Sequence, residues 1–439
     1  KGYGKPFALR YWGKQYLVLP PKYLADIKRA DKDHLSFFDS ISDVFFMYNW
    51  IGDLFKSSRM VSVVTKGINP ILPKLTKPMI EESFFAFDIA LGAFVALEFF
   101  SAIILRTVAR ILAGKELCRD PAFLDATTSY IAGNFMLGTL MLHLPFKACI
   151  RDFLAWPLCK YHAKTRQQRL LDIIKPIVTK RMQEERLGTL DTTEFDGISV
   201  TLKLLKDFPL DKNVSQTHTI AHEIRQLMWA AGQSPAITLT SMLFRLLSEP
   251  AYIEPLRKEA QAAVAKHGWN DEILRELPLQ DSYIREVHRM QPLFTLNAPR
   301  KVMDKPFTFS DGLTLSIGTQ FAFPAEASQQ DPDNLEKGQD FDGYRFAKLG
   351  ANAANQEEES NKWAASHADA TNMVFGYGNH VCPGRWMAVR LIKIVFSKVL
   401  IDYDVSWDRA GEEPPRFVLE GISVPNPTQK VYFQRRVNS

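Results

Sequence analysis

A loop with a single cysteine, Phe375-Gly-Tyr-Gly-Asn-His-Val-Cys-Pro-Gly-Arg385, is the feature that most restricts what this chain can fold into. Gly378 and Gly384 permit tight turns and a close approach of the backbone to a flat ligand. Pro383 fixes the backbone after Cys382, and a helix that follows would favour a negative sulfur through its N-terminal dipole. The loop therefore predicts a thiolate ligand at the start of a helix, with the leading phenylalanine shielding the sulfur from water.

Composition indicates a large packed core around this loop. Of the 439 residues, 46% are hydrophobic and 23% are charged, which excludes a disordered tail, a collagen-like repeat and a small disulfide scaffold. Lys and Arg number 54 against 49 Asp and Glu, a net charge of +5 that is too thinly spread to indicate a nucleic-acid partner. This small positive net charge is compatible with an acidic protein partner.

The other cysteines argue against a disulfide framework and against a structural zinc site. Cys118, Cys149 and Cys159 are scattered, and the sequence has no C-x-x-C pair. This usage suits a reducing compartment. The chain starts at Lys1 without a visible signal peptide, so we expect a preceding segment to be missing.

One apolar segment, from Phe84 to Leu105, is long enough to cross a membrane. Asp88 and Glu98 lie inside it, and each would be costly at bilayer depth. We therefore predict a buried or half-buried pair of helices there, and a chain that is soluble or peripheral as it stands.

The order of hydrophobic patterns predicts a mainly α protein with a minor β part, folded as one large domain over residues 1–439. Helical periodicity extends from about Lys22 to Leu277, and Thr217–Leu247 resembles one long helix interrupted only at Gly232 and Pro235. The remaining expected elements are a hairpin over 1–21, a helix over 279–290, strands over 293–325, a polar loop over 326–372, a helix over 386–400 and strands over 401–435.

The cysteine loop fits the pattern F-x-x-G-x-x-x-C-x-G, and the chain resembles a cytochrome P450, a haem-thiolate monooxygenase. Glu286-Val-His-Arg289 matches the family's E-x-x-R, 96 residues upstream of Cys382, and Arg345 matches the arginine that completes this network. Ala230-Ala-Gly-Gln-Ser234 lies where the family's central helix carries its oxygen-activating segment, and Gly114-Lys-Glu-Leu-Cys-Arg119 resembles fungal members. The resemblance implies the cytochrome P450 fold, with haem b (iron protoporphyrin IX) between the long central helix and the cysteine-loop helix.

By this resemblance Cys382 is the axial ligand of the haem iron, while Phe375, Gly378 and Gly384 shape its loop. Arg300 and His380 would hold the haem propionates. The pocket would be lined from segments 40–60, 135–160, 226–236, 291–298 and 421–425, and its candidate residues are Met228, Trp229, Gly232, Leu293, Phe294 and Leu296.

The central helix departs from the family pattern at three consecutive positions. Gln233 replaces the acid, Ser234 replaces the threonine, and Pro235 follows. A glutamine cannot exchange protons, but a serine hydroxyl still donates a hydrogen bond. Because Pro235 lacks an amide hydrogen, we expect the helix to open at the carbonyl of Ala231, although a simple bend is the alternative.

A second departure lies at Met60–Lys66, which replaces the usual aromatic or histidine and arginine of a propionate-binding helix. Lys66 is the one residue there that would compensate.

The resemblance implies oxidation of a C–H bond of an apolar natural product (a terpenoid, polyketide or indole/diketopiperazine alkaloid), using O2 and electrons from an NADPH–cytochrome P450 reductase. It also implies the cytosolic face of the endoplasmic reticulum membrane, reached through an N-terminal anchor that this chain lacks, and no nucleic acid. Alternatives are hydrogen abstraction without oxygen insertion, giving desaturation, ring closure or aryl coupling, and a non-enzymatic haem sensor or carrier. The candidate reductase contacts are basic residues near the cysteine loop: Lys362, Arg385, Arg390, Lys393 and Lys398.

Overall fold

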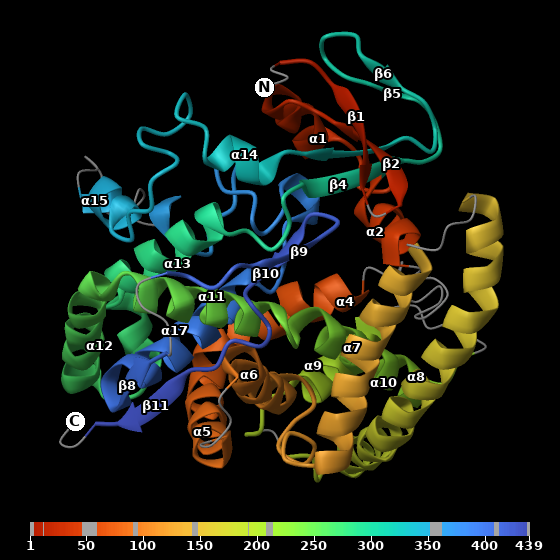
Figure 1. Cartoon of the computed structure of the whole chain (residues 1–439). Coiled ribbons are helices and arrows are strands. Elements are labelled where there is room, and N and C mark those ends of the chain that lie inside the picture. Colours follow the sequence, from red (N-terminus) through yellow and green to blue (C-terminus); the bar gives the residue numbers. More distant parts are fainter. Residues whose placement is uncertain are drawn as a thin grey trace.

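A computed structural model describes residues 4–11, 13–45, 59–90, 95–142, 148–191, 193–207, 214–351, 362–407 and 412–436. Helices dominate these residues, and the few strands are dispersed: those of the N-terminal segment lie at one end and the last strand of the chain lies at the opposite end (Figure 1). The α-helices are α1 Leu24–Arg29, α2 Phe37–Phe45, α4 Arg59–Ser62, α5 Leu72–Ala90, α6 Ala96–Leu112, α7 Pro121–Leu142, α8 Ala148–Leu187, α9 Gly197–Leu204, α10 Gln216–Ala231, α11 Ser234–Ser248, α12 Ile253–His267, α13 Pro278–Met290, α14 Ala325–Gln329, α15 Arg345–Ala351 and α17 Arg385–Asp402.

The β part consists of one five-stranded sheet and three two-stranded sheets. The larger sheet has the order β1-β2-β7-β4-β3, from β1 Phe7–Tyr11, β2 Lys14–Val18, β3 Leu35–Ser36, β4 Asn297–Val302 and β7 Gln320–Phe323. Its β2–β7 pair is parallel and its other pairs are antiparallel. The small sheets pair β5 Phe307–Thr308 with β6 Thr314–Leu315, β8 Tyr403–Ser406 with β11 Tyr432–Arg435, and β9 Phe417–Leu419 with β10 Ile422–Val424. The N-terminal hairpin thus pairs with a strand from beyond residue 290. The sequence pattern alone did not indicate this pairing.

The central helix is broken where the sequence predicts an interruption. The first half, α10, ends at Ala231, and α11 begins at Ser234. The amide of Gly232 still donates to Met228, 3.0 Å away, but Pro235 has no amide hydrogen to continue the ladder. The interruption is therefore a true break in the helix rather than a simple bend.

The apolar segment over 84–105 forms parts of two packed helices, α5 and α6, as predicted. Asp88 and Glu98 are exposed on their outer faces. Nowhere in the described residues does a helix have the length and hydropathy needed to span a membrane.

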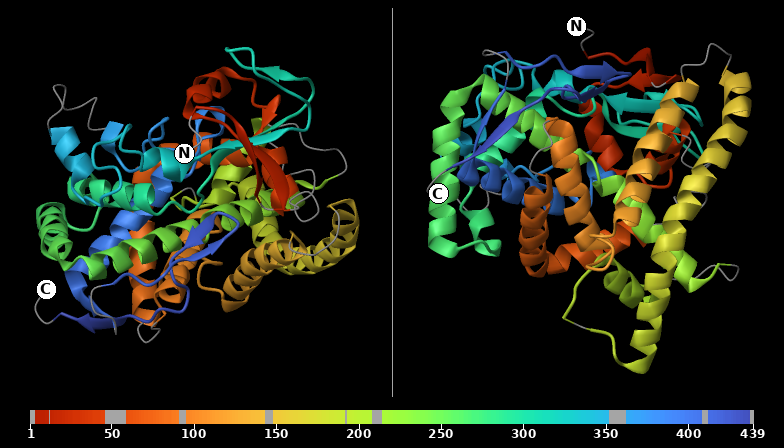
Figure 2. Two further views of the ribbon diagram at one scale, coloured as in Figure 1. Left: turned by 45° about the horizontal axis from the view of Figure 1, so that its top comes forward. Right: turned by 60° about the horizontal axis from the view of Figure 1, so that its bottom comes forward.

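One extensive core joins most of the helices, and a separate cluster packs against the five-stranded sheet. The buried side chains of the extensive core come from α5, α6, α10, α11, α13 and α17, among them Phe87, Phe99, Phe244, Tyr283 and Phe396, all at most 1% exposed. Figure 2 shows α7 and α8 side by side at one edge of the molecule, where they pack against each other. The stretch over 326–372, expected to be a polar loop, in fact includes most of α14 and the whole of α15.

Candidate active site

The loop before α17 is closed by a short main-chain hydrogen bond. The amide of Cys382 donates to the carbonyl of Phe375 at 2.7 Å, and the amide of Gly376 donates to Met373 at 2.8 Å. A single 3-10 turn, Gly378–His380, lies between them. The cysteine therefore emerges from a tight, internally bonded loop directly before the first turn of α17.

The sulfur of Cys382 lies at the N-terminus of α17, as predicted. Burial raises the pKa of this thiol, whereas the amides of Gly384 and Arg385 donate to the sulfur and lower that pKa. The Arg385 guanidinium donates to the Cys382 carbonyl at 2.9 Å. Two amide donors and a nearby cation in a desolvated site would stabilise a thiolate held by a metal.

Glycine is present at positions 378 and 384 of the loop for two different structural reasons. Gly378 has a φ of +66°, and a β-carbon there would lie 3.2 Å from the Cα of Lys28. Gly384 has an ordinary φ of −89°, and a β-carbon there would meet no atom within 4 Å. Gly378 is therefore required by the turn itself, whereas the space in front of Gly384 leaves room for a flat group.

Arg300, on β4, is a buried cation near the cysteine loop. It is 1% exposed, and its guanidinium donates to the Tyr377 carbonyl at 2.8 Å. Burial lowers the pKa of Arg300 to about 9. Among the residues that the structure describes it makes no ion pair, so its charge is available to an anionic ligand.

His380 lies beside Arg300 but faces the backbone of the segment between α1 and β3. Its Nε2 is 3.2 Å from the Lys32 carbonyl, and its ring stacks on Phe37 with centroids 5.8 Å apart. Burial and the charge of Arg300 lower the pKa of His380 to about 4, so the ring is neutral at neutral pH. The structure thus places Arg300 more favourably than His380 for holding a carboxylate.

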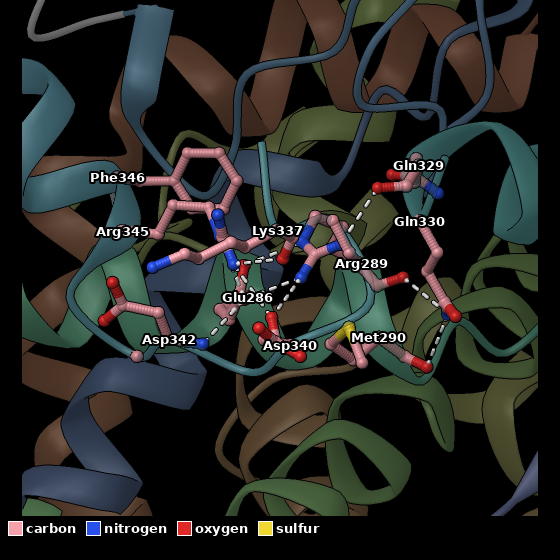
Figure 3. A network of polar contacts seen from close by, with 12 residues as sticks. Glu286, Arg289, Met290, Gln329, Gln330, Lys337, Asp340, Asp342, Arg345 and Phe346 are labelled. Atoms are coloured by element: carbon pink, nitrogen blue, oxygen red, sulfur yellow. Dashed lines mark hydrogen bonds and ion pairs between the residues drawn. The ribbon is translucent and has the colours of Figure 1, made fainter. Parts of the chain in front are cut away.

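Glu286, Arg289 and Arg345 form one buried polar network (Figure 3). Arg289 binds both carboxylate oxygens of Glu286, at 2.7 and 2.8 Å, and the Arg345 Nε lies 3.2 Å from the same group. Glu286 is fully buried. The two guanidinium groups also donate to main-chain carbonyls of Gln329, Glu336, Lys337, Gly338 and Asp340, so the network fixes the segment between α14 and α15.

The break in the central helix leaves Ser234 exposed at the start of α11. Ala230, on the other side of the break, is also exposed, whereas Gln233 receives a hydrogen bond from Ser101 of α6 at 3.4 Å. The Ser234 carbonyl accepts a hydrogen bond from Thr238. Thr238 was not predicted as a site residue, although its i, i+4 spacing from Ser234 within α11 would have indicated it.

The predicted pocket residues divide into two groups. Met228 is fully buried in the helical core, and a β-carbon on Gly232 would lie 2.8 Å from the Met228 carbonyl, so both positions serve packing. Trp229 is half-buried beside Ala230. The other three, Leu293, Phe294 and Leu296, are half-buried in the segment before β4.

Hydrogen bonds attach that segment to the β9–β10 hairpin. The amide of Ser423 donates to Leu293 and the amide of Thr295 donates to Gly421, each at 2.9 Å. Of the other expected lining segments, residues 46–58 and 143–147 lie outside the described part of the chain.

The segment Met60–Lys66, which replaces the usual propionate-binding helix, has no basic side chain that faces the interior. Lys66 is exposed, so it does not compensate for the missing arginine. Arg59 pairs instead with the buried Glu223 of α10, at 3.1 Å.

Three of the five predicted reductase contacts are wrong, because internal carboxylates neutralise them. Arg390 pairs with Asp271, Lys393 with Asp281 and Lys398 with Asp402, and all three basic side chains are less than a fifth exposed. Lys362 is exposed, and Arg385 lies over the ring of Trp386 with its guanidinium carbon 3.5 Å from the ring centroid.

The comparisons with known proteins agree with this geometry. The family model described as "Cytochrome P450" matches residues 46–433. "Cytochrome P450 monooxygenase sirB" of Leptosphaeria maculans is 35% identical, over 99% of this chain and 83% of its own length. "Ent-kaurene oxidase P450-4" of Gibberella fujikuroi is 26% identical over 98% of this chain and 85% of that protein.

Two further comparisons extend the agreement. "Pyrichalasin C-7 hydroxylase" of Pyricularia grisea is 26% identical over 99% of this chain and 86% of that protein. The solved structure "Retinoic acid bound cyanobacterial CYP120A1" shares the fold, with a TM-score of 0.70 at 17% identity over 98% of this chain and 92% of its own. The chain therefore belongs to the cytochrome P450 family and is a monooxygenase of the haem-thiolate class.

Proposed function

We propose that this enzyme oxidises a C–H bond of an apolar natural product, using O2 and electrons from an NADPH–cytochrome P450 reductase. The observation that carries the proposal is the pair of features around the cysteine loop. Cys382 presents a desolvated sulfur with two amide donors, and Arg300 lies buried nearby with no carboxylate partner among the described residues. A thiolate-ligated group with anionic substituents fits both features.

Haem b fits these residues. Cys382 would bind the iron, Gly384 leaves room for the flat ring, and the Arg300 guanidinium would bind a propionate, with His380 beside it. Phe375 and Gly378 would hold the loop in shape. When bound, haem supplies the oxidation of the C–H bond, and the protein supplies binding, orientation and control of water.

We propose that Ser234 delivers a proton at the helix break. Ser234 is exposed there, and no acidic residue stands next to it in the sequence. Gln233 accepts a hydrogen bond from Ser101, which ties the break to α6, and its amide does not deliver a proton itself. An ordered water between Ser234 and the Ala231 carbonyl, or a polar group of the substrate, would complete the relay.

The side chains proposed for the pocket suit an apolar substrate. Trp229, Leu293, Phe294 and Leu296 are half-buried, and none carries a charge. One fungal relative is named an ent-kaurene oxidase and another a pyrichalasin hydroxylase, so a terpenoid, a polyketide or an indole/diketopiperazine skeleton is the proposed class.

The surface around the cysteine loop suits an acidic reductase domain. Lys28 and Lys66 are exposed and make no ion pair among the described residues, and each flanks the loop. Lys28 lies against Gly378, and Asn69, three residues after Lys66, donates to the Pro383 carbonyl at 3.0 Å. We propose these two lysines and Arg385 as docking contacts, on the cytosolic face of the endoplasmic reticulum membrane.

The alternative is desaturation, ring closure or aryl coupling without oxygen insertion, which the lack of an acid at position 233 favours. One experiment decides between the two. Haem-loaded enzyme is incubated with a fungal reductase, NADPH, 18O2 and a panel of terpenoids, polyketides and diketopiperazines. Gain of one 18O atom supports monooxygenation, loss of two hydrogens supports the alternative, and a Cys382→Ser control should give neither product.

A further inference from the structure

His288 is a buried histidine for which the proposed chemistry has no use. It lies on α13, between Glu286 and Arg289 of the E-x-x-R segment. Its Nε2 is 3.1 Å from the Thr238 hydroxyl on α11, and its ring packs edge-to-face on Phe375, with centroids 5.6 Å apart. This one side chain therefore contacts both the second half of the central helix and the cysteine loop.

The direction of the hydrogen bonds follows from the atoms available. Thr238 donates its only hydroxyl hydrogen to the Ser234 carbonyl at 3.2 Å, so its oxygen accepts from His288 Nε2–H. Burial lowers the pKa of His288 to about 4, which keeps the ring neutral at neutral pH. Within the described residues nothing hydrogen-bonds to its buried Nδ1, as expected for the Nε2–H tautomer.

The first turn of α11 lacks one of the usual means of fixing a helix start, because the N-cap residue, Gln233, makes no capping hydrogen bond with its side chain. Pro235 lies in this first turn, where its missing amide hydrogen costs no helical bond. The amide of Ile237 donates to Gln233 at 3.1 Å. The Thr238 hydroxyl adds a side-chain hydrogen bond to the Ser234 carbonyl in this turn, and His288 holds that hydroxyl in place.

We propose that His288 is a positioning residue that holds the main chain at Ser234 in its reactive position through Thr238. The proposal rests on the proposed function, in which Ser234 delivers a proton. His288 touches neither substrate nor cofactor in this account. It acts by fixing the rotamer of Thr238 and thereby the first turn of α11.

Four matched variants test this bond. His288→Leu and Thr238→Val each remove one partner while keeping the volume similar. His288→Gln and Thr238→Ser each keep a group that can make the bond. The first readout is amide hydrogen exchange of residues 236–241 in the haem-loaded ferric protein. The second is the fraction of NADPH electrons lost as peroxide, with any compound of the panel that is converted.

We expect His288→Leu and Thr238→Val to raise both exchange and peroxide loss several-fold, and the two conservative variants to stay near wild type. The double variant His288→Leu/Thr238→Val should be no worse than either single variant, because both changes remove the same bond. Additive effects, or a wild-type exchange rate in His288→Leu, would overturn the proposal. If His288→Leu does not take up haem, Thr238→Val and its Thr238→Ser control decide the outcome in the same way.

The outcome is separable from that of the proposed function. If wild-type protein converts nothing on the panel, the proposed function is in question, whereas the exchange readout still tests the bond. If wild-type protein converts a substrate and the exchange rates of the His288→Leu and Thr238→Val variants equal those of wild type, only the role of His288 is wrong.

Discussion

The amide of Cys382 donates to the carbonyl of Phe375 at 2.7 Å, and this bond closes the loop that presents the sulfur. Because the cysteine's own amide is engaged, the amides that donate to the sulfur come from the next turn, at Gly384 and Arg385. The donors to the sulfur thus come from the loop and the first turn of α17, while Arg300 and Asn69 bind the loop from distant segments.

Replacement of Cys382 by serine should abolish the thiolate signature of the enzyme. Reduced wild-type protein with carbon monoxide should show the red-shifted Soret band of a thiolate-ligated haem, because the sulfur is the proposed ligand. Cys382→Ser should lose that band, and Cys118→Ser, which changes a buried cysteine elsewhere, should keep it. A Cys382→Ser protein that keeps the red-shifted Soret band of the wild type would contradict the assignment.

The two loop glycines should respond differently to substitution. A leucine at Gly384 meets open space in this structure, so Gly384→Leu should fold but lose haem occupancy. Gly378→Ala should instead lower stability, by about 1 kcal/mol or more, because its φ of +66° disfavours a β-carbon. Circular dichroism reports folding and the ratio of Soret to protein absorbance reports haem. Full haem occupancy in Gly384→Leu would show that the ring does not lie there.

Loss of Arg289 should severely destabilise the fold. Arg289→Ala leaves Glu286 buried with only the peripheral Arg345, and such a change costs roughly 3–5 kcal/mol. Arg289→Lys should be intermediate, since lysine keeps the charge but cannot bind both carboxylate oxygens. Yield of folded, haem-loaded protein and urea unfolding measure the effect. Normal yield of Arg289→Ala would mean that the network is dispensable.

Charge reversal at the lysines beside the cysteine loop should weaken reductase docking. Lys28→Glu and Lys66→Glu should each raise the KM for reductase by several-fold, and the effect should shrink as salt screens the charges. Lys164→Glu, on the exposed face of α8, is the control and should change nothing. Arg390→Ala should act on stability instead, because Arg390 is paired with Asp271. If Lys28→Glu and Lys66→Glu have the same KM for reductase as the control Lys164→Glu, this surface is not the docking site.

Glu259 should make the stability of the protein depend on pH. Its carboxylate accepts from the amides of Leu279 and Gln280 at 2.6 and 3.0 Å, yet burial raises its pKa from 4.5 to about 7. The folded protein therefore binds an extra proton between about pH 4.5 and 7, and this stabilisation is lost as the pH rises through 7. The loss is at most about 3 kcal/mol.

A matched variant isolates this contribution. Glu259→Gln remains neutral at every pH, so its free energy of unfolding should lack the decline that wild type shows between about pH 4.5 and 7. Urea unfolding at a series of pH values measures the difference. Parallel curves for the two proteins would show that Glu259 is already ionised at the lower pH.

Local sequence determined the cysteine loop, the E-x-x-R pair and the break in the central helix. Each of these depends on residues within a few positions of one another, such as Pro235 and the Ala231 carbonyl, so their geometry follows from backbone chemistry. The helix pair over 84–105 was predictable for the same reason, because the charges of Asp88 and Glu98 lie within the segment itself.

Only the tertiary structure decided which charges are free and which are paired. Arg390, Lys393 and Lys398 look like surface cations in the sequence, but Asp271 and Asp281 approach the first two from distant segments. Arg300 is the opposite case, since folding buries it beside the cysteine loop and gives it no carboxylate partner within the described part of the chain. Long-range packing fixes these pairings, and the same packing brings His288, Thr238 and Phe375 together from three separate elements, which no local spacing could have indicated.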